Sequence, residues 1–209
     1  MTTYLVPAGY GSGEYEEKRS RFIGQVLPVE TEAEALAHIA AVRKEHYDAR
    51  HTCFAYVIRD GGVVRYGDDG EPQGTAGQPI LAVLNGAGVQ NVCCTVTRYF
   101  GGVLLGTGGL VRAYTAAAKA ALEDAGISQM AQWRCVTLRC AYNQFDRVKR
   151  LLEEQEAVTE NVDYGADIVI SALVREDKAE TFAAALRELS AGSISAETTG
   201  ERFCGVRVK

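Results

Sequence analysis

The chain has 209 residues and a mass of 22.5 kDa, which is long for one compact domain and suits two domains of roughly 100 residues each. A composition of 47% hydrophobic and 23% charged residues can bury a core and excludes a disordered chain. The net charge of −5 divides into −3 over residues 1–125 (11 Lys+Arg against 14 Asp+Glu) and −2 over residues 126–209 (11 against 13), so neither half is a strongly basic nucleic-acid-binding domain.

The sequence carries no membrane, secretion or metal signal. The first twenty residues contain no apolar h-region, and the longest uncharged apolar runs, such as Ile80–Leu84, are far shorter than the ~20 residues that span a bilayer. The six cysteines include no CxxC pair, and the three histidines do not stand at zinc-ligand spacing. We therefore expect a cytoplasmic protein with reduced thiols, no membrane partner, no metal and no cofactor. The sequence gives no indication of the oligomeric state.

The first predicted elements are a strand at residues 21–29 and a helix that ends near residue 46. Thr31 and Glu34 form a capping-box pattern, in which each side chain can accept a hydrogen bond from the other residue's backbone amide. The helix is expected to bury a stripe made of Leu36, Ile39 and either Val42 or Arg43.

The rest of the first half is rich in glycine, since 13 of the 22 glycines lie between Gly61 and Gly109. The elements expected there are strands at 51–58 and 63–66 joined by a hairpin turn, a short helix at 78–85, a strand at 91–99 and a long helix at about 108–124. The long helix is expected to end at Gly126 and to bury Leu110, Val111, Tyr114, Ala118 and Ala121.

The second half predicts a complete βαββαβ pattern. Its elements are a strand at 135–141, a helix capped by Asn143, strands at 157–163 and 167–173, a helix around 182–189 and a strand at 194–203. This order is typical of the ferredoxin-like fold, with four antiparallel strands backed by two helices. We expect an α+β protein with domains at residues 1–128 and 134–209.

The segment from Asp68 to Gly77, DDGEPQGTAG, stands directly before a predicted helix. Its glycines allow positive φ and close approach of a ligand, and free amides at the helix start would favour an anion. In the alternative interpretation the loop is structural and its carboxylates cap nearby amides. Both interpretations stay open, and the segment matches neither common phosphate-binding glycine motif.

The segment from Arg98 to Tyr114 joins a strand end, a glycine turn and a helix start. Arg98 and Arg112 could hold an anion, and Tyr99 or Phe100 could stack on a base. In the alternative interpretation the rings belong to the core and the arginines pair with acids of the 68–77 loop, a common structural arrangement. We expect the two segments to meet in space.

His51 and Cys53 lie two residues apart on a predicted strand, so both point to the same face. They could act as base and nucleophile, although most such pairs are packing residues. A catalytic thiol needs a setting that stabilises the thiolate. The vicinal Cys93 and Cys94 are expected to be buried, one on each face of their strand.

Several motifs over residues 15–125, in order and at natural spacing, resemble the IMPACT/YigZ family. They are KRSRF from Lys18, ARHTCFA from Ala49, DDGEP from Asp68, GTAG from Gly74, PIL from Pro79, RYFGG from Arg98 and LGTGGL from Leu105. The resemblance implies a bacterial two-domain member. Its first domain would have the fold of the second domain of ribosomal small-subunit protein five, with a four-stranded sheet and two helices on one face. Its second domain would be similar to the last domain of elongation factor G.

The resemblance further implies a binding role in the regulation of translation, with RNA, the ribosome or a ribosome-associated protein as partner. The rival interpretation is a hydrolase acting on a phosphorylated or peptide substrate through His51, Asp68, Asp69 and Glu71. Any attraction for RNA is expected to come from Lys18, Arg21, Arg98 and Arg112, because a net negative chain repels polyanions at long range. The candidate binding residues are Lys18, Ser20, Arg21, His51, Asp68, Asp69, Glu71, Gly74, Thr75, Gly77, Arg98, Tyr99, Phe100, Gly101, Gly102, Gly106, Gly109 and Arg112.

Overall fold

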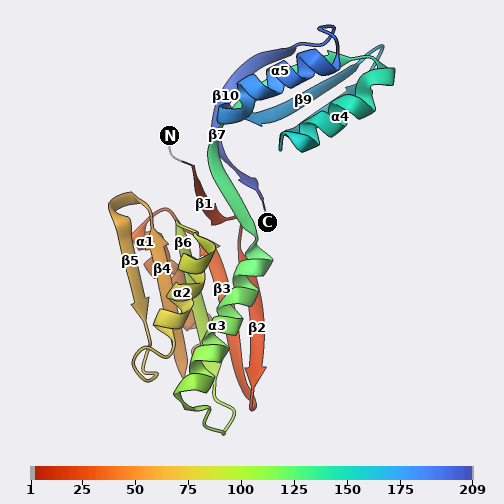
Figure 1. Ribbon diagram of the computed structural model, residues 1–209. Helices are drawn as coiled ribbons and strands as arrows, with labels where there is room; N and C mark the ends of the chain where they lie inside the picture. Colours follow the sequence, from red (N-terminus) through yellow and green to blue (C-terminus); the bar gives the residue numbers. More distant parts are fainter. Residues whose placement is uncertain (1–2, 209) are drawn as a thin grey trace. The chain divides into compact units, whose positions relative to one another are not determined.

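A computed structural model describes residues 3–208, and the chain divides into two compact units (Figure 1). Most of the larger unit is Tyr4–Gln129, and most of the smaller unit is Met130–Val206. Both units combine a sheet with helices, which confirms the predicted α+β class. The strand β7 (Ile127–Cys140) begins in the larger unit and continues into the smaller one. No helix within residues 3–208 is long and apolar enough to cross a membrane.

Within the described residues, the sheet of the larger unit has five strands. Their order across the sheet is β2 (Gly11–Glu17), β3 (Ser20–Pro28), β6 (Val92–Tyr99), β4 (His51–Ile58) and β5 (Val63–Gly67). All neighbours are antiparallel. The starts of β3 and β4 therefore lie at the same end of the sheet as the ends of β5 and β6. The glycine-rich connections leave the sheet at this end (Figure 1).

Helices cover both faces of this sheet. Figure 1 shows α2 (Gly77–Ala87) and α3 (Gly106–Ala125) on one face and α1 (Glu32–Glu45) behind the sheet. Cys94 is buried in the core beneath α2 and α3, whereas Cys93 is buried in the core beneath α1. The two vicinal cysteines thus lie on opposite faces of β6, as expected from the alternation of side chains along a strand.

Two strands near the start of the chain were not predicted. They are β1 (Tyr4–Pro7), where Leu5 forms a parallel bridge with Val89, and β2 at the sheet edge. The sequence of β2, GSGEYEE, has no β-branched residue and only Tyr15 among its strand-favouring residues, so its strand signal is weak. Its glycines have a packing role, because a Cβ on Gly11 or Gly13 would overlap with α3. The sheet consequently has one strand more than the resemblance implied.

The predicted ends of the helices agree with the structure better than their predicted buried faces do. The Thr31–Glu34 capping box is present, and Gly126 ends α3 with a positive φ of 68°. However, Leu36 is 52% exposed, and α1 instead buries Ala35, Ile39 and Val42. Of the two alternatives Val42 and Arg43, Val42 is the buried one, and Val111, predicted to be buried in α3, is exposed. The buried face of α1 was predicted wrongly because Ala35, which is buried, is less hydrophobic than its neighbour Leu36, which is exposed.

The smaller unit has the predicted βαββαβ order. Its elements are β7, α4 (Phe145–Glu154), β8 (Val158–Tyr164), β9 (Ile168–Arg175), α5 (Ala179–Leu189) and β10 (Ala196–Arg207). The strand order β10-β7-β9-β8 is that of a ferredoxin-like sheet. Leu138, Leu152 and Phe182 belong to a core that is separate from the core of the larger unit.

The start of α4 differs from the prediction. Asn143 does not cap this helix, because it lies within a short 3₁₀ turn at Tyr142–Gln144 that leads into α4. The residue before α4 is Gln144, which makes no side-chain cap hydrogen bond to the helix. Asn is common both at helix caps and in turns, so its presence alone does not fix where a helix begins.

Candidate functional site

The structure brings the 68–77 loop and the segment that begins at Arg98 together. The Nη1 atom of Arg98 donates to Oε1 of Glu71 over 2.7 Å, and the two side chains are 7% and 4% exposed. The hydroxyl of Tyr114, from α3, donates to the same carboxylate oxygen over 2.9 Å. This contact confirms that Arg98 pairs with an acid of the loop. Arg98 therefore cannot serve as a freely exposed cation.

Arg98 is the second-last residue of β6 and points toward the face covered by α2 and α3. Its guanidinium carbon lies 5.4 Å from the ring centroid of Phe22 and 5.5 Å from that of Phe100. Its Nη2 makes a long contact of 3.4 Å with Ser20 Oγ, while its Nε is buried and has no hydrogen-bond acceptor within the described residues. The guanidinium thus retains unused donor capacity.

Asp68 holds the loop against the start of α2. Its carboxylate accepts hydrogen bonds from the backbone amides of Gly74 (2.8 Å), Ala76 (3.1 Å) and Gly77 (2.8 Å). These amides are therefore already occupied. Of the two interpretations left open, the structural one holds for Asp68, because the amides of Ala76 and Gly77 already donate to its carboxylate and are not free to bind an anion.

Asp69 links the same loop to β4 and α1. Its carboxylate accepts from the Thr52 amide over 2.7 Å and from the Arg43 guanidinium over 2.8 Å. Its carbonyl oxygen lies 2.7 Å from Nδ1 of His51. Because a carbonyl can only accept, Nδ1 of His51 carries the proton, and Nε2 is the ring atom that remains available to a ligand.

Cys53 faces the same side of the sheet as His51, as predicted, but it is unsuited to catalysis. Its thiol is fully buried and donates to the carbonyl oxygen of Asp68 over 3.0 Å. Burial raises the pKa of this thiol to about 12. The thiolate is the reactive form of cysteine, so Cys53 is an inert packing residue at neutral pH.

Alkylation with iodoacetamide at pH 8 is expected to spare Cys53 in the folded protein and to modify Cys135 and Cys204, which are partly exposed. Mass spectrometry of the native and denatured protein measures the difference. Rapid native labelling of Cys53 would contradict the assignment of this residue as a buried packing residue.

The raised pKa of the Cys53 thiol also makes stability depend on pH. Its pKa in the folded protein lies above the unfolded value of about 8.5. The stability linked to the protonated thiol is therefore present at neutral pH and is lost as the pH rises toward 12.

A cavity of about 370 Å³ opens at the end of the sheet where the two segments meet. Its polar wall comprises Arg50, His51, Glu71, Arg98 and Thr107, and its apolar wall includes Phe100, Leu104 and Leu110. Gly70 and Gly106 also line it. The cavity thus combines cationic side chains, an aromatic ring and backbone from the start of α3. This is the set of groups expected of a site for a phosphorylated or nucleotide-like ligand.

Several predicted site residues lie outside this cavity. Tyr99 points to the opposite face of the sheet, where its hydroxyl lies 3.0 Å from Nδ1 of His46 and donates to Asp48. Of the two rings considered, Phe100 is therefore the one at the cavity, and it is 40% exposed. Arg21 forms an exposed ion pair with Glu14. Lys18 and Arg112 are exposed and do not line the cavity.

The remaining predicted residues shape the loops. The backbone of Gly101 lies so close to that of Arg19 that no larger residue fits, and its amide donates to Ser20 Oγ over 3.1 Å. The others adopt positive φ, hydrogen-bond within the loop or pack closely; they are Gly74 (φ 77°), Gly102 (φ 82°), Gly106 (φ 71°), Thr75 with the Pro72 carbonyl, Gly77 against Gly67, and Gly109 against Leu105. Apart from Gly106, whose backbone lines the cavity, these residues position the site from outside the cavity lining.

Arg50 is a cavity residue that was not included among the candidates. It is exposed, lines the cavity, and its guanidinium carbon lies 5.8 Å from the centroid of the Phe100 ring. No carboxylate of the described residues pairs with it. The sequence did offer one indication of its role, because Arg50 immediately precedes His51, a predicted site residue at the start of β4.

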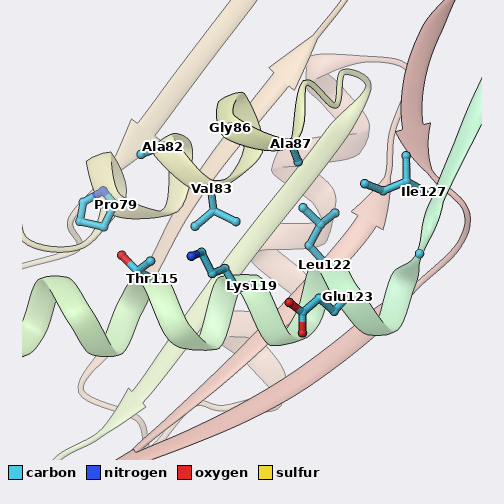
Figure 2. A pocket seen from close by; sticks show the side chains of 11 residues that line it. Pro79, Ala82, Val83, Gly86, Ala87, Thr115, Lys119, Leu122, Glu123 and Ile127 are labelled. Carbon is cyan, nitrogen blue, oxygen red and sulfur yellow. The ribbon is translucent and has the colours of Figure 1, made fainter. Parts of the chain in front are cut away.

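A second, larger cavity of about 760 Å³ lies between α2 and α3 (Figure 2). Figure 2 shows Val83 from α2 and Leu122 from α3 in its wall, and its charged groups are Lys119 and Glu123 on α3. Two opposite charges in an otherwise apolar groove do not define a reaction or a ligand. We therefore assign the functional site to the smaller cavity.

Comparison with known proteins finds a matching family model for part of each unit. The Impact N-terminal domain model matches residues 18–122, and a domain of unknown function, DUF1949, matches residues 138–193. The IMPACT family member YigZ of Escherichia coli (strain K12) is 38% identical over 197 residues, covering 93% of this chain and 97% of YigZ. YvyE of Bacillus subtilis (strain 168), also an IMPACT family member, is 34% identical and covers 92% and 89%.

A solved structure described as a hypothetical protein is also similar to this chain. It shares 37% sequence identity with a TM-score of 0.60, and the match covers 96% of this chain and 98% of the other. The similarity to the relatives thus extends over both units and nearly their full lengths. On this evidence the chain belongs to the IMPACT family.

Proposed function

We propose that this protein is a cytoplasmic regulator of translation that binds RNA or a ribosome-associated partner through the glycine-rich end of its larger unit. The observation that carries the proposal is the cavity at this end, where Arg50, exposed and without a carboxylate partner in residues 3–208, stands beside the exposed ring of Phe100. A cation beside an exposed aromatic ring is the arrangement that binds a phosphate together with a base. Family membership supports the assignment to translation.

We favour binding over hydrolysis because the three carboxylates of the rival catalytic cluster are already engaged, which leaves His51 without a carboxylate partner in catalysis. Asp68 holds backbone amides, Asp69 holds Thr52 and Arg43, and Glu71 is buried with Arg98. A general base must be able to reach the proton that it removes. None of these carboxylates, nor the protonated thiol of Cys53, is placed to activate a nucleophile.

Ultraviolet crosslinking in native lysate tests this function. The tagged full chain is expected to crosslink to RNA, and the crosslinked material is expected to sediment with ribosomes. Arg50→Glu should reduce the RNA crosslink several-fold by placing a negative charge at the cavity. The matched control is Arg65→Glu, which makes the same charge change at an exposed residue of β5. Recovery of no RNA would contradict RNA as the partner, and recovery of neither RNA nor ribosomal material, or equal loss in both variants, would contradict the proposal.

We also propose that residues 1–128 and 134–209 act as separate folding domains. The support is that the two units have distinct hydrophobic cores, one around Phe22 and Tyr114 and the other around Leu152 and Phe182. A fragment comprising residues 130–209 is expected to show the circular dichroism and the cooperative thermal melting of a folded α+β domain. A fragment that is unfolded while the full chain is folded would contradict this proposal.

A further inference from the structure

We propose that the cavity beside Arg50 and His51 binds the 5′-phosphate of a nucleotide, with the phosphate at the start of α3 and the base against Phe100 and Leu104. This inference rests on the proposed function and names the ligand chemistry of the same site. It predicts that the protein distinguishes a phosphorylated 5′ end from an unphosphorylated one.

The start of α3 is the first element of the proposed phosphate site. The helix has 20 residues, its N-cap is Leu105, and no side chain caps its first amides. The first turn contains no acidic residue, and Gly106 and Thr107 line the cavity. A Cβ on Gly106 would meet nothing within 4 Å, so a ligand can approach the backbone closely. Uncapped amides and the positive end of a helix dipole favour an anion.

At the start of α2, by contrast, backbone amides already donate to an anionic side chain of the protein. There the Asp68 carboxylate accepts from Ala76 and Gly77, the residues at which the helix begins. The described part of the chain thus supplies its own anion to the start of α2 and none to the start of α3. An incoming phosphate would take the place at α3 that Asp68 takes at α2.

Arginine side chains line the cavity at the proposed phosphate position. Arg50 is exposed and unpaired among the described residues. His51 donates through Nδ1 to the Asp69 carbonyl, and its Nε2 can donate to a phosphate in the protonated form of the ring. Arg98 also lines the cavity, its side chain is only 7% exposed, and its Nε has no acceptor. The charge of Glu71, the acidic residue in the lining, is balanced by Arg98. The cavity therefore keeps a net positive charge from Arg50.

The size and the apolar rim of the cavity favour a single nucleotide. A volume of about 370 Å³ is at the lower end of small-molecule sites, which span about 300–1,000 Å³. Phe100 is 40% exposed, and Leu104 is 84% exposed. Exposed apolar groups beside a phosphate site offer a surface on which a base can stack without a requirement for sequence. An extended duplex has no comparable exposed base face.

Fluorescence anisotropy with the full chain tests this inference. The probes are two 3′-labelled hexa-adenylates, one with a 5′-phosphate and one with a 5′-hydroxyl. The 5′-phosphorylated probe is expected to bind about tenfold more tightly or better, because charge-assisted hydrogen bonds form only with its terminal phosphate. Competition with adenosine 5′-monophosphate separates two sources of the same chemistry. Effective competition identifies a free nucleotide as a ligand, and weak competition identifies an RNA end.

Matched variants locate the phosphate. Arg50→Gln is expected to abolish most of the preference for the 5′-phosphate, while Arg65→Gln, an exposed arginine of β5, retains it. Thr107→Pro removes one backbone amide in the first helical turn, where proline is tolerated, and should weaken the preference, whereas Thr107→Ala keeps the amide and should not. Equal affinity for the two probes would overturn this inference and leave the proposed function standing. No affinity for either probe would overturn this inference and RNA as the partner in the proposed function, leaving a ribosome-associated protein.

Discussion

Replacing Arg98 with Ala is expected to lower the free energy of unfolding of the larger unit by about 3–5 kcal/mol. The reason is the Glu71 carboxylate, which is buried and would keep only the Tyr114 hydroxyl as a partner. A buried charge without its counter-ion costs far more than the net value of the ion pair. Urea denaturation followed by circular dichroism measures the loss, and hydrogen exchange in β6 assigns it to this unit.

Two comparisons make the Arg98 result specific. Arg112→Ala removes an exposed arginine and is expected to change stability by no more than about 0.5 kcal/mol. The double variant Arg98→Met with Glu71→Met removes both charges and should recover much of the loss, since apolar replacement of a buried pair is often close to neutral. If Arg98→Ala lost less than about 1 kcal/mol of unfolding free energy, the buried charge of Glu71 would not depend on its pairing with Arg98.

Replacing Gly24 with Ala is expected to destabilise the protein by about 3 kcal/mol, at the upper end of the range for overpacked cores. Gly24 lies on β3, and an added Cβ would overlap with the backbone carbonyl oxygen of Ala117 in α3. The obstacle is helix backbone, which cannot move aside as a flexible side chain could. The helix would have to shift away from the sheet.

The control for this prediction is Gly86→Ala. Gly86 lies within α2, and a Cβ there would meet nothing within 4 Å. Alanine favours the helix over glycine, so this variant is expected to gain up to about 1 kcal/mol. Thermal and urea denaturation of the two variants should therefore give opposite signs. Equal stability of Gly24→Ala and the parent protein would contradict the close packing of α3 on the sheet.

Regular elements with strong local signals could be predicted from the sequence. The capping box of Thr31 and Glu34, the glycine that ends α3 and the βαββαβ order of the smaller unit depend on neighbouring residues and on apolar spacing. The strand β2 could not, because its glycines are selected by contact with α3 and not by strand propensity. Such contacts join residues about a hundred positions apart and leave no local pattern.

The candidate site, like the fold, could be predicted from the sequence only in part. The motifs brought attention to one end of the sheet, and the structure shows that His51, Glu71, Arg98 and Phe100 from these motifs line one cavity there. They did not show that Arg98 is committed to Glu71, nor that Arg50 lines the cavity without a carboxylate partner among the described residues. Which arginine is buried depends on where β6 ends relative to α3. That relation arises only when the strand and helix pack together.

Amide chemical-shift mapping of the isotope-labelled full chain tests the central claim most directly. On titration with a 5′-phosphorylated hexa-adenylate, the largest shifts are expected at Arg50, His51 and the first turn of α3 from Gly106, since these groups line the cavity. Shifts confined to Met130–Val206, or no shifts at RNA concentrations that saturate the crosslink, would contradict the placement of the binding site in the larger unit.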